Sequence, residues 1–253
     1  HLLISCLPSA DKVFSDIFKS ENYKDLNSSE KTMVINQYLN WGLIYRLDVK
    51  KISQFEKQLE LLLIQETEIS IQARLIRAFA QMSINNSKVN SFIKQNLFKK
   101  ELVASCLFYF ERAPSAVAVE LLEKHVDNEL MGGNFSVQLV KALASQNHQL
   151  LKNKKIENYI LHLADSLTEA NKNTELHKHL LLLLVKLPFL DLKSFTLESL
   201  KCPEVEVQLN AVIAVKSYQD EKSAENIAKL LSSPVESIRG RALDTLLATP
   251  GLR

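Results

Sequence analysis

The histidines, together with the carboxylates near them, are the side chains of this sequence that could exchange protons or hold a metal ion. His177 and His179 lie two residues apart in a stretch of helical periodicity, so about 200° separates their side chains and one ion cannot bind both. His162 and Asp165 lie three residues apart, a spacing that lets them touch on one helix face either as an oriented pair or as an ordinary surface contact. We therefore expect no metal site, and we keep His162 and Asp165 as candidate binding residues.

Motifs that build an activated nucleophile or a phosphate-binding loop are missing from the sequence. It holds no Gly-x-Ser-x-Gly turn and no glycine-rich phosphate loop, and the adjacent Gly132 and Gly133 fit the end of a helix. Cys6, Cys106 and Cys202 are too scattered for a disulfide framework or a CxxC metal site. The sequence thus predicts neither an enzyme nor a protein with a cofactor.

Charge and hydropathy limit the classes of partner. A formal net charge of +2 over 253 residues is nearly neutral, and the basic clusters at Lys99–Lys100 and Lys152–Lys155 are short. Nucleic-acid binding needs such charges gathered on one face, with aromatic side chains between them for stacking. The longest purely apolar run, Leu180–Val185, is far too short to cross a bilayer. We expect a cytoplasmic protein that does not bind nucleic acid.

Tyr38, Trp41 and Tyr45 form a compact aromatic group in the N-terminal part of the chain. Their spacing of i, i+3, i+7 places them along one ridge of a helix. Such a ridge could anchor a partner, since Tyr and Trp combine a large apolar body with a polar tip and are enriched at interfaces. It could equally belong to a helix that is buried on a wide face. Both interpretations stay open at the level of sequence.

Cys6 supports a different prediction for the location of the protein. Leu3-Ile4-Ser5-Cys6 resembles the processing site of bacterial lipoproteins, in which the cysteine is acylated. Pro8-Ser9 fits a junction between helices equally well. The alternative prediction is therefore a lipid-anchored protein of the bacterial envelope.

A repeated pattern of apolar residues predicts the elements that must position all these side chains. In the C-terminal part, apolar residues follow the order i, i+4, i+5, i+8 from Val207 and again from Ile238, 31 residues later. This order is one stripe on a helix of 3.6 residues per turn. The same stripe starts at Ile71, Leu102, Phe135 and Leu176, with a looser copy at Val34.

A second apolar-periodic segment lies between successive copies of the stripe. These segments predict partner helices over residues 52–64, 89–97, 117–130, 156–167, 189–200 and 224–231. Helix pairs repeated at this period indicate a solenoid, because one pair cannot bury its own apolar face. We expect an all-α fold: a right-handed superhelix of about seven helix pairs, with residues 1–253 as a single domain. Because the chain begins and ends inside first helices, it could be a fragment of a longer array.

Residues 203–247 carry a family resemblance. Proline before the first helix, and Val-Gln-Leu-Asn-Ala-Val (207–212) or Ile-Arg-Gly-Arg-Ala-Leu (238–243) within it, resemble HEAT repeats of the short type also found in phycobilisome-lyase proteins. Over residues 30–201 only the helix pattern is similar. The resemblance implies an α-solenoid whose second helices line a concave surface and which binds other macromolecules.

The polar positions of the second helices are therefore the expected docking surface for a protein partner. They alternate in sign, which suits a partner of mixed charge better than a polyanion. They are Glu157, His162, Asp165, Lys193, Glu198, Lys222, Glu225 and Lys229. The resemblance also leaves open a HEAT-like DNA enzyme that acts on alkylated bases, although the aromatic and basic residues that such an enzyme needs do not gather in this sequence.

Overall fold

All described elements of the protein are helical. The structure is a computed structural model, and it describes residues 10–19, 21–44, 49–130, 134–167, 173–218 and 220–249. Within these ranges no strand occurs, which confirms the predicted all-α fold. No helix within them is long and apolar enough to cross a membrane.

Contacts divide the chain into two compact units, residues 1–113 and 114–253. The helices of the first unit are α1 (Ala10–Lys19), α2 (Glu21–Asp25), α3 (Ser28–Ile44), α4 (Val49–Gln65), α5 (Ile69–Met82), α6 (Ser87–Asn96) and α7 (Lys100–Arg112). Those of the second unit are α8 (Ala116–Leu130), α9 (Ser136–Ser145), α10 (Lys154–Ser166), α11 (Thr174–Leu184), α12 (Lys193–Ser199), α13 (Val205–Val215), α14 (Glu221–Lys229), the 3-10 helix η2 (Leu230–Ser232) and α15 (Glu236–Ala248). That one domain spans the whole chain stays a prediction.

First and second helices alternate along the chain as the apolar stripe predicts. Copies of the stripe fall on α5, α7, α9, α11, α13 and α15, and the segments between them form α4, α6, α8, α10, α12 and α14. The residues at the i+4 position of the stripe are all fully buried: Leu75, Cys106, Leu139, Leu180, Ala211 and Ala242. The repeat read from the sequence is therefore the repeat of the fold, an α-solenoid.

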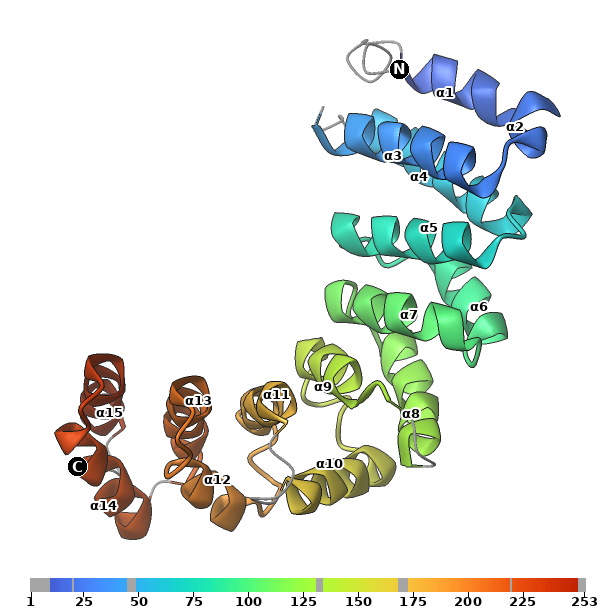
Figure 1. The fold of residues 1–253 in the computed structure, drawn as a ribbon. Coiled ribbons are helices and arrows are strands. Elements are labelled where there is room, and N and C mark those ends of the chain that lie inside the picture. Colours follow the sequence, from blue (N-terminus) through green and yellow to red (C-terminus); the bar gives the residue numbers. More distant parts are fainter. Residues whose placement is uncertain are drawn as a thin grey trace. The chain divides into compact units, whose positions relative to one another are not determined.

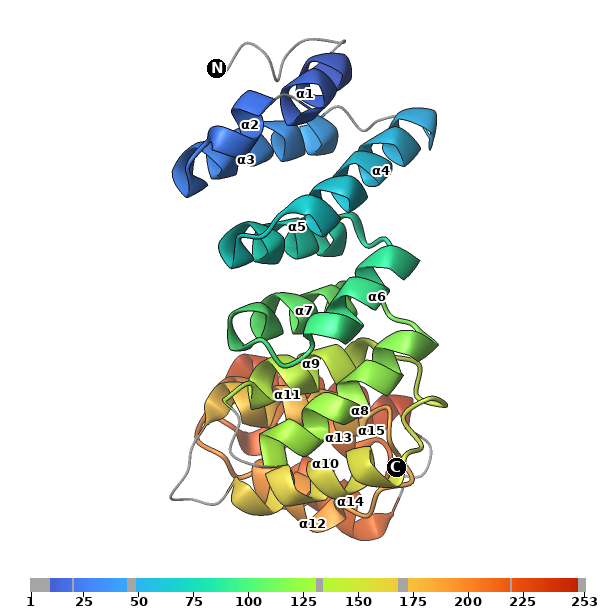
Figure 2. The same cartoon turned by 90° about the vertical axis from the view of Figure 1, so that its right-hand side faces the viewer.

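Within each unit the closest packing joins first helices to one another. In the first unit α5 packs along α7, and α4 and α6 lie inclined to them (Figure 2). In the second unit α9, α11, α13 and α15 form one row, with α10, α12 and α14 along its other side (Figure 1). That the second helices line a concave surface stays a prediction. The handedness of the superhelix stays a prediction.

One second helix is shorter than the apolar pattern indicates. The pattern predicts a helix over residues 189–200, whereas α12 begins only at Lys193. Leu187, Leu190 and Leu192 are buried in a series of turns, in which the Leu190 amide donates to the Leu187 carbonyl at 3.0 Å. Pro188 disfavours a helical conformation for Leu187, so the apolar residues here anchor a loop.

Buried polar side chains attach the loops to the helices. In the first unit the Glu66 carboxylate accepts from the Lys31 ammonium at 3.3 Å and from the Thr67 amide at 3.1 Å. In the second unit the Glu129 carboxylate accepts from the Phe135 amide at 3.0 Å and from the Ser136 hydroxyl at 3.0 Å, at the start of α9. Helix ends expose amides and carbonyls without partners inside the helix, and these side chains satisfy some of them.

Asn86 connects three helices of the first unit. Its side-chain oxygen caps α6 by accepting from the Lys88 and Val89 amides, at 2.9 and 3.0 Å. Its Nδ2 donates to Glu60 of α4 at 2.6 Å, and its own amide donates to the Tyr109 hydroxyl of α7 at 2.8 Å. Asn86 thus caps α6 and also connects α6 to α4 and α7.

Replacing Asn86 by Ala should therefore lower the free energy of unfolding by about 2 kcal/mol, the upper end of the range for a lost cap. Asn153→Ala is the matched control, since the Asn153 side chain caps α10 through the Lys155 amide alone; its cost should be nearer about 1 kcal/mol. Urea unfolding of both variants measures the difference. Equal costs would show that the contacts of Asn86 with α4 contribute nothing.

A buried histidine in α8 makes the second unit sensitive to acid. His125 is only 2% exposed, and this burial lowers the pKa of its imidazole to about 4, because the charged form is poorly solvated there. In the unfolded chain the pKa is about 6.5, so between these two values the unfolded state binds a proton that the folded state does not. The free energy of unfolding is therefore highest above the pKa of the unfolded chain, and it falls as the pH drops toward about 4.

Between about pH 7 and about pH 5 the free energy of unfolding of the wild-type protein should fall by about 2 kcal/mol, and we expect His125→Leu to abolish this fall. Chemical unfolding at the two pH values measures it. His148→Leu, at an exposed position in the turn after α9, is the control and should leave the loss in place. An identical pH dependence for wild type and His125→Leu would contradict the assignment.

Candidate partner-binding groove

The structure buries the aromatic residues that could have formed a binding ridge. Tyr38 and Trp41 in α3 are each only 2% exposed. The Tyr38 ring lies 5.1 Å from that of Phe14 in α1 and 4.7 Å from that of Phe55 in α4. The hypothesis of an exposed ridge is therefore wrong for Tyr38 and Trp41, which form the aromatic core of the first unit. Tyr45 lies outside the described residues.

The polar residues proposed for docking lie apart on three second helices of the second unit. His162 and Asp165 are exposed on α10, Glu198 on α12, and Glu225 and Lys229 on α14. None of them lines the groove described below. Their exposure is compatible with the predicted role, but the structure does not gather them around one hollow, and their role in binding stays a prediction.

Lys193, also predicted to bind a partner, is held by an ion pair. Its ammonium lies 2.8 Å from the Asp220 carboxylate, which joins the start of α12 to the start of α14. Asp220 also caps α14 by accepting from the Ser223 amide at 3.1 Å. The hydrogen bond from Lys193 lowers the pKa of the Asp220 carboxyl, so the pair stays charged at neutral pH. Lys193 therefore has a structural contact that a partner would have to displace.

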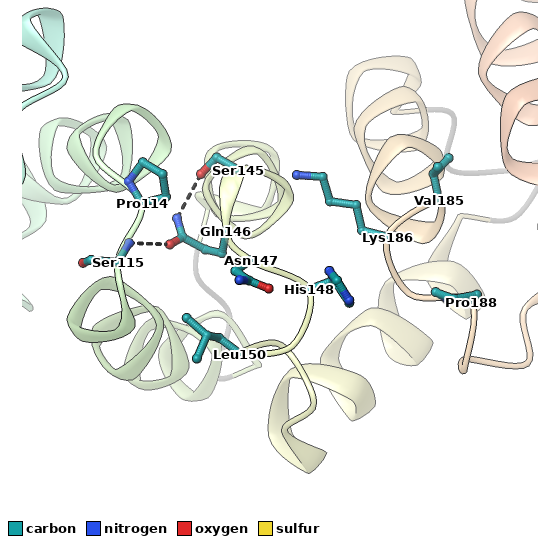
Figure 3. A pocket seen from close by; sticks show the side chains of 10 residues that line it. All are labelled: Pro114, Ser115, Ser145, Gln146, Asn147, His148, Leu150, Val185, Lys186 and Pro188. Carbon is teal, nitrogen blue, oxygen red and sulfur yellow. Dashed lines mark hydrogen bonds between the residues drawn. The ribbon is translucent and has the colours of Figure 1, made fainter.

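Three turns of the second unit border an open groove of about 780 Å³, which we call the loop groove (Figure 3). The turns precede α8, follow α9 and follow α11. The lining residues are Pro114, Ser115, Ser145, Gln146, Asn147, His148, Leu150, Val185, Lys186 and Pro188.

A buried glutamine holds two walls of the loop groove together. The Gln146 side-chain oxygen accepts from the Ser115 amide at 3.1 Å, and its Nε2 donates to the Ala142 carbonyl at 2.8 Å. The third wall is attached by Lys186, whose ammonium donates to the Ala144 carbonyl at the end of α9. Hydrogen bonds to the ends of helices thus connect the walls of the groove.

The surface of the loop groove is apolar with a weak positive character. Leu150, Val185 and Pro188 are exposed there, and the neighbouring Phe189 is exposed with the Lys152 ammonium 5.8 Å from its ring centroid. Of the ten lining residues, His148 and Lys186 can carry a positive charge and none is acidic. Exposed apolar side chains in a hollow favour contact with another molecule.

The polar groups of the loop groove do not form an acid–base or nucleophilic set. The Ser115 hydroxyl accepts from the Ala118 amide at 3.0 Å and the Ser145 hydroxyl donates to the Ala142 carbonyl at 2.7 Å, so both cap or close a helix end. The His148 Nε2 lies 2.9 Å from the side-chain nitrogen of Gln149 and contacts no carboxylate that would orient it as a base. The arrangement can bind a molecule by shape and charge.

Two further observations concern reactive side chains elsewhere in the described residues. Burial raises the pKa of the Cys106 thiol to about 12, which keeps it protonated and inert. No group of three His, Cys, Asp or Glu side chains within the described ranges could hold a metal ion. The sequence could have pointed to the loop groove only through its turn residues, which recur once per repeat and so fall on one edge of the stack.

Comparison with known proteins supports the fold. No protein-family profile and no curated protein sequence matches the chain. One engineered protein of known structure is similar over 96% of this chain and 68% of its own, with 15% identity and a TM-score of 0.58. Another engineered protein is similar over 77% of this chain and 97% of its own, with 15% identity and a TM-score of 0.54. The likeness concerns the fold alone, a helical-repeat solenoid of the general kind that the resemblance to HEAT repeats implies.

The buried position of Trp41 predicts the effect of its removal. Trp41→Ala should lower the free energy of unfolding by about 3 to 5 kcal/mol, because it leaves a cavity among the rings of α1, α3 and α4. Phe98→Ala removes an aromatic side chain that is exposed in the loop before α7 and should cost less than about 0.5 kcal/mol. Thermal unfolding monitored by circular dichroism separates them. A Trp41→Ala protein as stable as wild type would contradict the core assignment.

Proposed function

We propose that this protein is a binding module and not an enzyme, and that it docks a short segment of a partner protein in the loop groove. The observation that carries this proposal is the exposure of Leu150, Val185 and Pro188 in one hollow whose walls are connected through Gln146 and Lys186. An apolar hollow that exists before binding favours a ligand that brings its own apolar side chain.

The charge of the loop groove indicates the charge of the segment that it binds. Lys186 gives the groove a positive charge, and no carboxylate stands among its lining residues. The segment should therefore combine an apolar side chain with an acidic one. A single short segment buries far less than the roughly 1,200 Å² of a standard interface, so we expect an affinity of about micromolar order.

The same features favour a protein partner over nucleic acid. A phosphate backbone is bound by rows of lysine and arginine, whereas Lys186 is the one lining residue with a permanent positive charge and it donates to the Ala144 carbonyl. We also propose a cytoplasmic location. Cys106 and Cys202 are both free thiols, which is usual in a reducing compartment. Cys6, on which the lipid-anchored alternative rests, lies outside the described residues.

Selection of a random peptide library on the wild-type protein tests the proposal. The selected peptides should share an apolar residue near an acidic one, and Leu150→Glu should weaken their binding at least about tenfold by placing a carboxylate in the groove. Leu182→Glu changes an equally exposed leucine on α11 outside the groove and is the matched control. Circular dichroism checks that both variants stay folded.

Two results would overturn the proposed function. One is peptide binding that Leu150→Glu and Leu182→Glu leave unchanged. The other is tight binding of duplex DNA that falls steeply with added salt, which would favour the DNA-binding alternative.

A further inference from the structure

An exposed aromatic ring and an ammonium group are in contact at the rim of the loop groove. The Lys152 ammonium lies 5.8 Å from the centroid of the Phe189 ring. Phe189 directly follows Pro188, and Lys152 comes two residues after Leu150. Pro188 and Leu150 both line the groove, on different turns (Figure 3). The contact therefore joins the turn after α9 to the turn after α11, and we call Phe189 and Lys152 the rim pair.

The ring of Phe189 offers apolar area that a bound molecule can cover. Phe189 is 42% exposed even with Lys152 beside it, whereas Phe79 and Phe110 on first helices are fully buried. Aromatic side chains bury a large apolar area when they leave water, and they are frequent anchors at protein interfaces. The rim pair thus extends the apolar surface of the loop groove beyond its lining residues.

Lys152 differs from Lys186, the cation inside the groove. The Lys186 ammonium donates to the Ala144 carbonyl at the end of α9, where the helix dipole places partial negative charge. Among the described residues the Lys152 ammonium has neither an ion pair nor a hydrogen-bond acceptor, and its contact is with the ring of Phe189. Lys152 is therefore the cation that can bind a carboxylate without losing a hydrogen bond.

Carboxylates of the neighbouring elements have other contacts. Asp127 lies 2.9 Å and Glu123 lies 3.8 Å from the Lys155 ammonium, at the start of α10. Burial raises the pKa of the Tyr218 hydroxyl, and the charge of Asp191 adds to this effect, so Asp191 lies near the end of α13. The rim pair thus presents a positive charge that no described carboxylate neutralises by an ion pair.

We propose that the rim pair is the subsite of the loop groove that binds the acidic residue of the docked segment. The carboxylate of that residue contacts Lys152, and the adjoining backbone covers the ring of Phe189. This inference rests on the proposed function and specifies it, since the apolar side chain of the segment occupies the hollow that Leu150, Val185 and Pro188 line. Because Lys152 is only two residues from Leu150, the acidic and apolar residues of the segment lie within about four positions of each other.

A single-stranded nucleic acid is the competing ligand for such a pair, since aromatic and cationic side chains also form sites that stack bases. Those sites place several aromatic rings and a row of cations along the backbone. Of the rim pair and the ten lining residues, Phe189 supplies the one phenyl ring, and Lys152 and Lys186 supply the two permanent positive charges. These numbers favour one acidic side chain over a polyanion.

Parallel selection of one random peptide library on the wild-type protein and on Lys152→Glu tests the inference. Peptides from the wild type should carry an acidic residue near an apolar one. Peptides from Lys152→Glu should carry a basic residue at the same position, because reversing the charge of the site reverses its preference. Lys99→Glu changes an exposed lysine in the loop before α7 and is the matched control, which should keep the acidic preference.

Fluorescence anisotropy with one peptide from the wild-type selection measures the size of the effect. Lys152→Glu should weaken its binding at least about tenfold, and a lysine in place of the acidic residue of the peptide should restore binding to within about threefold. Phe189→Ala should weaken it about fivefold, whereas Phe98→Ala, which removes an exposed ring outside the groove, should not change it. Circular dichroism verifies that these variants at exposed positions stay folded.

The possible outcomes separate this inference from the proposed function. An acidic preference that is the same on wild type and Lys152→Glu, together with loss of binding in Leu150→Glu, would overturn the inference alone. Failure to select any peptide on the wild type would overturn both. Binding of an oligo(dT) strand that is tighter than that of the peptides and is lost in Phe189→Ala would make single-stranded nucleic acid the ligand and contradict the inference.

Discussion

The fold depends on the width of the apolar stripe on each first helix. A stripe that follows the order i, i+4, i+5, i+8 covers more of the helix than one neighbour can bury. Residues such as Ala211 and Val212 on α13 are fully buried only because α11 and α15 pack on either side. Each first helix thus depends on the next for its stability, and the energy of the stack is close to a sum over neighbouring helices.

Regular packing of this kind leaves the ends of the helices to be satisfied separately. Polar side chains perform this task, and they differ from one repeat to the next: Asn86 at α6, Glu129 at α9 and Asp220 at α14. These residues also bind the loops to the helix ends. Repeats that have similar cores therefore differ in the surface that they present at the edge of the stack. The loop groove lies at this edge, where Gln146 and Lys186 connect the turns that follow α7, α9 and α11.

The proposed binding surface has its origin in the turns between the helices of the solenoid. The loop groove is a product of sequence variation between repeats, since the longer turn after α9 supplies Asn147, His148 and Leu150. A ligand of the loop groove would be recognised by these local side chains.

The sequence by itself determined the helices and the alternation of first and second helices, because helical periodicity is a local property. It also determined the residues at the centre of each interface, since the i+4 residues of the stripe are buried in any stack in which the first helices pack side by side. It could not decide between the two interpretations of Tyr38 and Trp41, since a ridge beside an apolar stripe is buried or exposed according to which helices pack on it, and α1 and α4 do. The start of α12, the pairing of Lys193 with Asp220 and the meeting of three turns around Gln146 also depended on tertiary structure. Asp220 lies 27 residues from Lys193, and Ser115 lies 31 residues from Gln146. The loop before α12 has no periodicity, so local spacing carries no information about these three features.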